Sequence, residues 1–191
     1  STPCGTLFPY TTLFRSPLQI ICRNSLPQGA SLFRRLENDS INIQEVGLLK
    51  IPKPGEKLPK PIIEFTTKLE EIDRFISEDE AKQIACLGKN QLNEVKNIAL
   101  RVNEVITKHA ESLGLVHADS KIELGIDAKG KIIVVDTVGT ADENRFILND
   151  IHVSKQVMRN YYLFRGLEKK IQSWAKKNKP RSSWDIPEVL P

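Results

Sequence analysis

The sequence predicts an α+β fold in which helices pack against an antiparallel sheet, and three stretches of the chain support this prediction. Residues 115–135 form two apolar-rich runs around a turn signal at Asp127–Gly130, which is typical of a β-hairpin. Residues 77–113 carry apolar side chains at helical spacing, and Leu18–Cys22 is a short apolar run that fits a further strand. With 191 residues, 40% of them hydrophobic and 27% charged, the chain can bury one sizeable core.

The first sixteen residues are expected to lie outside this fold. The peptide Thr6–Ser16 corresponds to the translated end of a common sequencing-adapter oligonucleotide, so we predict a non-native leader over 1–16 and one folded unit over 17–191. The alternative is a targeting or amphipathic segment, since several apolar residues precede Arg15. A signal peptide would need a basic start, a longer apolar core and a small-residue cleavage site, which this segment lacks.

After the strand Leu18–Cys22, the sequence predicts a turn over Arg23–Gln28 and a helix from Ser31 to Glu37. Helix starts present free backbone amides to anions, so Arg23, Ser31 and this helix start form a candidate phosphate site. The alternative is that Ser31 only caps the helix and Arg23 lies on the surface. Residues 38–61 contain four prolines and several lysines and are expected to form an extended loop.

The middle of the chain predicts a long helix that serves as scaffold. Ser77 and Glu80 have the spacing of a capping box, and apolar residues recur up to Gly114, with a break near Gly88. A further helix is expected over Val153–Gly166. The basic segment that follows, residues 165–181, is interpreted as a solvated terminal helix, with a nucleic-acid or membrane-surface helix as the alternative.

The first strand of the hairpin separates apolar from ionisable side chains. Alternation along a strand places one set of residues on a polar face, namely His117, Asp119, Lys121 and Glu123. His117 is interpreted as a packing residue rather than a substrate contact, and His109 as an exposed or packing residue.

Pairing the two strands across the turn places Lys121 opposite Asp136 and Glu123 opposite Val134. In this register Asp136 lies diagonal to Glu123 on the same face, at roughly 5 to 6 Å. Magnesium prefers one or two carboxylates together with water and phosphate oxygens, so this pair beside a lysine suits a metal bridged to a nucleotide. The alternative is a half-solvated hairpin whose charges face water.

Four motifs resemble the SAICAR synthetase family. The run DSKIELGID, followed by VVD and GTADENRF, resembles the metal-site hairpin of that family. Upstream, PLQIICRN and GASLFRRLE are similar to its strand, RN turn and helix start, and GEKLPKPIIEFTTKLEEIDRFIS is similar to its LPxP segment. Downstream, SKQVMRNYY resembles its KQxxR helix. The resemblance covers nearly everything from Pro17 onward and implies the larger, C-terminal part of the SAICAR synthetase fold.

The resemblance implies an ATP-dependent ligase of de novo purine biosynthesis that joins L-aspartate to carboxyaminoimidazole ribotide (CAIR) and forms SAICAR, ADP and phosphate. It also implies roles for individual residues of this chain. The metal Mg²⁺ would be held by Glu123 and Asp136; Lys121 would contact phosphate or the reacting carboxylate, and Asp119 the ribotide or the amine. The ribotide phosphate would be bound by Arg23, Ser31 and Arg145, and the dicarboxylate or the ribotide by Arg159 and Lys68.

The chain departs from the family pattern at three points: Thr137 stands where an acid is usual, the segment Asp136–Arg145 is one residue longer than in many bacterial members, and Ala30 separates the expected Gly and Ser. Neither GxGxxG nor GxxxxGK[ST] occurs in the sequence. We therefore expect a truncated ligase without its ATP-binding lobe and with little or no turnover. The alternative is an inactive fragment or a basic nucleic-acid-binding module that keeps the scaffold.

The expected partners are therefore the small molecules CAIR, aspartate and ATP, without nucleic acid or membrane, and a homo-oligomer is left open. No apolar run approaches the roughly 20 residues that span a bilayer. The composition is ordinary for a globular protein, so a cytoplasmic location is expected.

Overall fold

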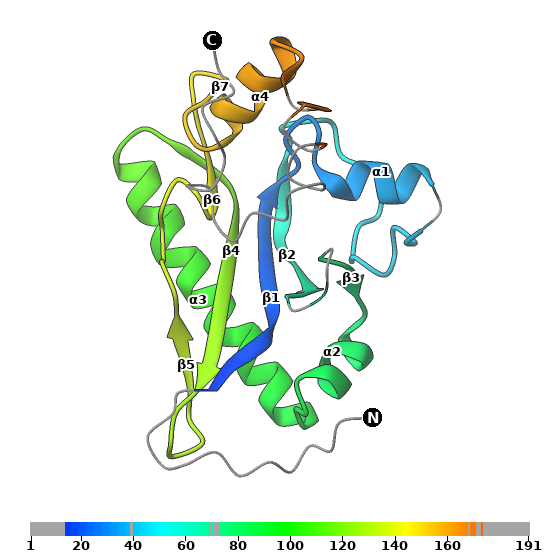
Figure 1. Cartoon of the computed structure of the whole chain (residues 1–191), viewed down its shortest axis with the longest axis vertical. Coiled ribbons are helices and arrows are strands. Elements are labelled where there is room, and N and C mark those ends of the chain that lie inside the picture. Colours follow the sequence, from blue (N-terminus) through cyan, green and yellow to red (C-terminus); the bar gives the residue numbers. More distant parts are fainter. Residues whose placement is uncertain are drawn as a thin grey trace.

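The computed structural model describes residues 14–38, 40–68, 70, 73–167, 169–170 and 173. Within these residues seven strands form one antiparallel sheet in the order β3-β2-β1-β4-β6-β7, with β5 paired to β4, and the long helix α3 crosses one face of it (Figure 1). This confirms the predicted fold class. The elements are β1 Phe14–Ser25, α1 Ser31–Glu37, β2 Lys57–Thr67, β3 Phe75–Ile76, α2 Glu78–Ile84, α3 Lys89–Ser112, β4 Val116–Ile126, β5 Ile132–Val135, β6 Asn144–Leu148, β7 Ile151–His152 and α4 Gln156–Phe164.

Strand β1 is longer at both ends than the predicted run Leu18–Cys22. It begins at Phe14, three residues before the expected start of the folded unit, and Arg15 pairs with Gly125 of β4. The origin of the leader stays a prediction, and residues 1–13 lie outside the described part of the chain. The expected turn at Arg23 is wrong, because β1 continues to Ser25 and the chain turns only at residues 28–29.

Strand β2 takes up the end of the segment that was expected to be a loop. It begins at Lys57, which pairs with Ser25, and regular pairing resumes at Ile62 opposite Arg23. Pro59 and Pro61 fall in the irregular stretch between these pairs. Proline has no N–H to donate to a ladder, so it is accommodated where the pairing is interrupted.

The main core lies between the sheet and helices α2 and α3. It is made of apolar side chains from one sheet face and from the helices, including Leu18, Ile20, Phe65, Leu92, Val95, Ala99, Ile122 and Leu124. The predicted helix start is confirmed, since Ser77 Oγ accepts a hydrogen bond from the Glu80 amide at 3.2 Å. The expected break is also present, because α2 ends at Ile84 and Gly88 caps the start of α3.

The β4–β5 hairpin forms as predicted, but its register differs by one residue. Glu123 lies opposite Val135, so the predicted pairs Glu123–Val134 and Lys121–Asp136 are wrong. The reason is the loop. Asp127 N donates to Lys131 O at 3.0 Å, which closes a three-residue loop with Gly130 at φ +79° instead of the two-residue turn assumed from the sequence. Asp136 follows the last pair, at a left-handed φ of +67°.

A bulge in β4 also changes the expected alternation of its side chains. His117 pairs with Phe146 and Asp119 with Arg145, which leaves Ala118 as an extra residue on β4. His117 therefore faces α3, whereas Asp119 faces the other side of the sheet. The prediction that both lie on one polar face is wrong, and the interpretation of His117 as a packing residue agrees with its 3% exposure.

The end of the chain differs in part from expectation. Helix α4 spans Gln156–Phe164 and is shorter than the predicted Val153–Gly166, because β7 and a bend precede it. The basic segment 165–181 lies mostly outside the described residues, so its interpretation stays open. None of the helices in the described part of the chain is both long and apolar enough to cross a membrane.

Candidate functional site

The sheet face opposite α3 carries a cavity of about 330 Å³ bounded by β1, β4 and β6 and by the start of α1. The strand register explains why polar side chains meet there. Arg23 of β1 lies directly opposite Asp119 of β4, and Asp119 lies opposite Arg145 of β6. Five of the predicted site residues line this cavity: Arg23, Ser31, Asp119, Lys121 and Arg145.

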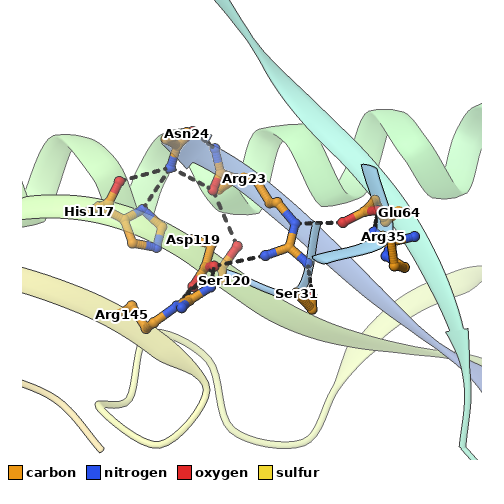
Figure 2. A network of polar contacts seen from close by, with 10 residues as sticks. Arg23, Asn24, Ser31, Arg35, Glu64, His117, Asp119, Ser120 and Arg145 are labelled. Carbon is orange, nitrogen blue, oxygen red and sulfur yellow. Dashed lines mark hydrogen bonds and ion pairs between the residues drawn. The ribbon is translucent and has the colours of Figure 1, made fainter. Parts of the chain in front are cut away.

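Arg23 is the most deeply buried charged group of this site, at 2% exposure. Its Nε donates to Glu64 Oε2 at 2.5 Å, its Nη1 to Asp119 Oδ2 at 3.2 Å, and its Nη2 to Ser31 Oγ at 3.1 Å (Figure 2). A buried guanidinium is stable only when its donors are satisfied and its charge is paired. The alternative in which Arg23 is a surface residue is therefore wrong.

Asp119 lies between two guanidinium groups. Besides Arg23, it accepts from Arg145, whose Nε donates to Asp119 Oδ1 at 2.8 Å and whose Nη2 contacts Oδ2 (Figure 2). Arg145 keeps more exposure than Arg23, at 14% of its side chain against 3%. One carboxylate thus holds a fixed arginine and a more accessible one against the same wall of the cavity.

Ser31 does not act as the helix cap that the sequence also allowed. The N-cap of α1 is Ala30, which makes no side-chain cap bond. Ser31 is the first helical residue, and its hydroxyl accepts from Arg23. The local helix prediction is confirmed, since α1 spans Ser31–Glu37 as expected, but its serine belongs to the arginine cluster.

Sequence reasoning missed a second carboxylate and a third arginine. Glu64 of β2 is buried at 6% exposure and binds Arg35 of α1 as well as Arg23. The Arg35 guanidinium carbon also lies 3.6 Å from the centre of the Phe75 ring, which is a cation–π contact. A glutamate within the apolar run of β2 was the signal that could have found this part of the site. We call Arg23, Arg35, Arg145, Glu64 and Asp119 the arginine cluster.

The arginine cluster has one positive charge in excess, because three arginines face two carboxylates. Lys121 extends it along β4, with its Nζ 3.7 Å from Glu143 Oε2. Lys155, from the turn before α4, and Asp73 also line the cavity, and their charges offset each other as those of Lys121 and Glu143 do, so the excess of one positive charge remains. The local balance therefore favours an anionic ligand.

Lys68 and Glu123 form a separate ion pair one step further along the sheet. Their side chains are 22% and 12% exposed, and neither residue lines the cavity described above. The structure thus brings Lys68 to Glu123, an association that the sequence did not predict. Arg159 lies on α4, but the described structure does not include its side chain.

The predicted metal ligands fit Mg²⁺ by the type of their donors. Both are carboxylates, and magnesium needs only one or two of these besides water and phosphate oxygens. The observed register does not place Asp136 beside Glu123 as expected, and Asp136 Oδ1 accepts from the Thr137 amide at 2.9 Å. Among the described residues there is no group of three or more His, Cys, Asp or Glu arranged for a metal. Their role as ligands stays a prediction.

Comparison with known proteins gives one consistent family. The SAICAR synthetase family model matches residues 13–179. A relative from Archaeoglobus fulgidus is 39% identical over 178 residues, which are 93% of this chain and 54% of the relative; its provisional name is phosphoribosylaminoimidazole-succinocarboxamide synthase. The chain thus spans about half the length of that relative.

Two solved structures have the same fold as this chain. A type-2 SAICAR synthetase in complex with ADP matches with a TM-score of 0.66 and 25% identity, over 90% of this chain and 67% of that one. The Saccharomyces cerevisiae SAICAR synthase, solved with SAICAR, matches with a TM-score of 0.63 and 27% identity, over 82% of this chain and 52% of that one.

Proposed function

Because the chain belongs to the SAICAR synthetase family, we propose that it is the substrate-binding part of an ATP-dependent carbon–nitrogen ligase that makes SAICAR from CAIR and L-aspartate. The relatives solved with ADP and with SAICAR support a nucleotide and a ribotide as ligands. The chain covers 54% of the archaeal relative, which supports the proposal that it is incomplete and lacks the ATP-binding lobe.

The observation that carries this proposal is the arginine cluster beside Ser31. A ribotide phosphate is a compact dianion that needs several convergent donors, and arginine supplies them in a fixed planar geometry. Arg23 is held by three partners and cannot move far, whereas Arg145 and Ser31 are more accessible. In this proposal Arg145 and Ser31 contact the phosphate, and Arg23 holds Asp119 and Ser31 in place behind them.

The remaining residues suit the activation of a carboxylate. A carboxylate is a poor electrophile, so the ligase first transfers the γ-phosphoryl group of ATP to it, and the amine of aspartate then displaces phosphate. Positioning and charge neutralisation account for most of such catalysis. Lys121 is proposed to neutralise charge at the reacting carboxylate, Asp119 to orient the ribotide or the amine, and Lys68 and Arg159 to bind the dicarboxylate or the ribotide.

Mg²⁺, held by Glu123 and Asp136, would neutralise the phosphate oxygens of ATP when it is bound. This assignment is supported by the donor type of the two side chains alone. Lys68, which pairs with Glu123, would hold that carboxylate in place before the metal binds. Replacing Glu123 by Gln should therefore weaken the binding of Mg²⁺ itself, which calorimetric titration of the chain with the metal alone measures.

Isothermal titration of the chain with SAICAR tests the phosphate site. Arg145→Ala should weaken binding by about tenfold or more, because a charge-assisted hydrogen bond contributes roughly 1.5–3 kcal/mol. Arg101→Ala is the matched control, since Arg101 is an exposed arginine on the far side of the sheet, on α3. Equal affinities of these two variants would contradict the proposed site.

Turnover of the 191 residues with CAIR, aspartate and ATP tests the proposed truncation. Little or no SAICAR should form, because the sequence carries no glycine-rich phosphate-binding motif. Robust turnover would refute the truncation while leaving the substrate site intact.

A further inference from the structure

A buried polar network lies on the other face of the sheet, directly behind the arginine cluster. It joins α3 to three strands through side chains that are nearly all buried: Asn24, Asn103, Thr107, His117, Ser120 and Asn144. Asn24, Asn103, Thr107 and His117 are not among the residues that line the cavity. The proposed function does not use these side chains as ligand contacts.

Each strand of the site contributes one neighbour to this network. Asn24 follows Arg23 on β1, and Ser120 follows Asp119 on β4. Successive side chains of a strand point to opposite faces, so a single peptide unit carries a network residue on one side and a cluster residue on the other. Figure 2 shows this arrangement for Asn24 and Arg23, which point away from each other. A shift of the network must therefore move the cluster.

The same holds for the third strand. Asn144 precedes Arg145 on β6, and its amide Nδ2 donates to Thr140 O at 2.8 Å. This bond orients the amide so that its Oδ1 accepts from His117 Nε2 at 3.0 Å. His117 is thus the group that ties β6 to the rest of the network.

A neutral His117 makes these bonds as one tautomer only. Its Nε2 lies 3.0 Å from Asn144 Oδ1, which can only accept, so Nδ1 of the neutral ring is the acceptor and lies 2.8 Å from the Thr107 hydroxyl Oγ1. The proton is then on Nε2, where it is donated to Asn144. Burial lowers the pKa of His117, which agrees with the neutral form.

The bulge in β4 makes this arrangement possible. In a regular strand His117 and Asp119 would share a face, but the extra residue Ala118 turns His117 toward α3 and leaves Asp119 facing Arg145. Bulges next to functional sites commonly re-aim a side chain.

We propose that His117 is a positioning residue, which in its neutral Nε2–H form ties β1, β4 and β6 together behind the sheet and sets the spacing of Arg23, Asp119 and Arg145 for a phosphate ligand. The inference rests on the proposed function and extends it to a residue that does not touch the ligand. Binding sites of this kind require placement within about 0.5 Å, which a fully hydrogen-bonded support provides.

Two variants separate positioning from simple packing. His117→Gln retains a donor at the reach of Nε2, whereas His117→Asn is too short to meet Asn144. Both lose the imidazole, so both should lower the melting temperature by similar amounts. His109→Gln is the control, because His109 is exposed on α3. SAICAR affinity should stay within about threefold for His117→Gln and fall by about tenfold or more for His117→Asn.

A measurement without ligand keeps this test independent of the proposed function. The Nε–H signals of Arg23 and Arg145 in ¹H–¹⁵N spectra report on their bonds to Glu64 and Asp119. They should persist in His117→Gln and shift or broaden in His117→Asn. If wild-type protein fails to bind SAICAR, the proposed function fails, and these signals alone decide the positioning role.

Three results would overturn the proposal. The first is that both variants lose SAICAR affinity and arginine signals in proportion to the decrease in their melting temperatures, since this would mean that His117 has a structural role only. The second is unchanged arginine signals in His117→Asn. The third is a wild-type His117 that ring-nitrogen spectra show to be protonated on Nδ1.

Discussion

Removing the carboxylate of Asp119 should be among the most costly single changes in the described part of the chain. Asp119 is 7% exposed and accepts bonds from both Arg23 and Arg145. Asp119→Asn would leave Glu64 as the only carboxylate among three arginines of the cluster. Breaking a buried ion pair from one side costs about 3–5 kcal/mol, and we expect the lower end because Arg145 can relax toward solvent.

For a chain of this size, 1 kcal/mol corresponds to a shift of about 2–4 °C in melting temperature, so Asp119→Asn should melt roughly 6 to 12 °C lower. Differential scanning calorimetry measures this shift, and denaturant unfolding measures the free energy directly. Asp142→Asn is the matched control, because Asp142 is exposed in the turn before β6. If Asp119→Asn unfolds within about 1 kcal/mol of this control, the carboxylate does not hold the two arginines as described.

Inorganic phosphate provides a second arm of the same experiment. In Asp119→Asn the cluster has one further uncompensated positive charge, and an anion that binds the folded state stabilises it by about 2.7 kcal/mol at a hundredfold excess over its dissociation constant. Phosphate should therefore raise the melting temperature of the variant more than that of the wild type, at ionic strength matched with chloride. An equal response of both proteins would argue against an anion site at the arginine cluster.

Three further predictions concern other parts of the structure. Burial lowers the pKa of His117 below its ordinary 6.5, so the unfolded chain binds more protons than the folded chain between the two pKa values. The free energy of unfolding should therefore fall as the pH drops through this window. Denaturant unfolding should show a smaller difference in this free energy between wild type and His117→Gln at about pH 5.5 than at about pH 7.5. Lys68→Met should lower the melting temperature, because the loss of Lys68 leaves the 12%-exposed Glu123 carboxylate unpaired, and Glu123→Gln in the same chain should restore part of it. Additive losses in the double variant would contradict the pair. Gly130→Ala should cost about 1 kcal/mol in denaturant unfolding, since Gly130 has φ +79°, whereas an unchanged midpoint would contradict the three-residue loop.

The features that were predictable from sequence are those that local chemistry decides. Helix α1 has the predicted bounds, and Ser77 caps α2, because capping and apolar spacing act over a few residues. The hairpin turn at Asp127 was equally local. Its register was not, since one additional residue in the loop moves every pair by one position. The predicted proximity of Glu123 and Asp136 depended on that single residue.

The parts of the site that were missed depend on contacts between distant segments. Glu64 joins the arginine cluster only because β2 pairs with β1, and Arg35 only because α1 docks beside that strand. His117 changes face because of a bulge set by its pairing with β6. Alternation along one strand cannot reveal a bulge, since the extra residue is defined by the partner strand.

The two faces of the sheet together explain how a cluster of arginines can be prepared for an anion before the anion arrives. Like charges so close together would repel and would lose their hydration on burial. Glu64 and Asp119 compensate for both effects and leave one positive charge in excess. The network behind the sheet then fixes the strands from which these groups project, so little reorganisation remains when a phosphate binds. Such preorganisation lowers the cost of binding, and here it depends on neutral side chains of which most, His117 among them, do not line the cavity.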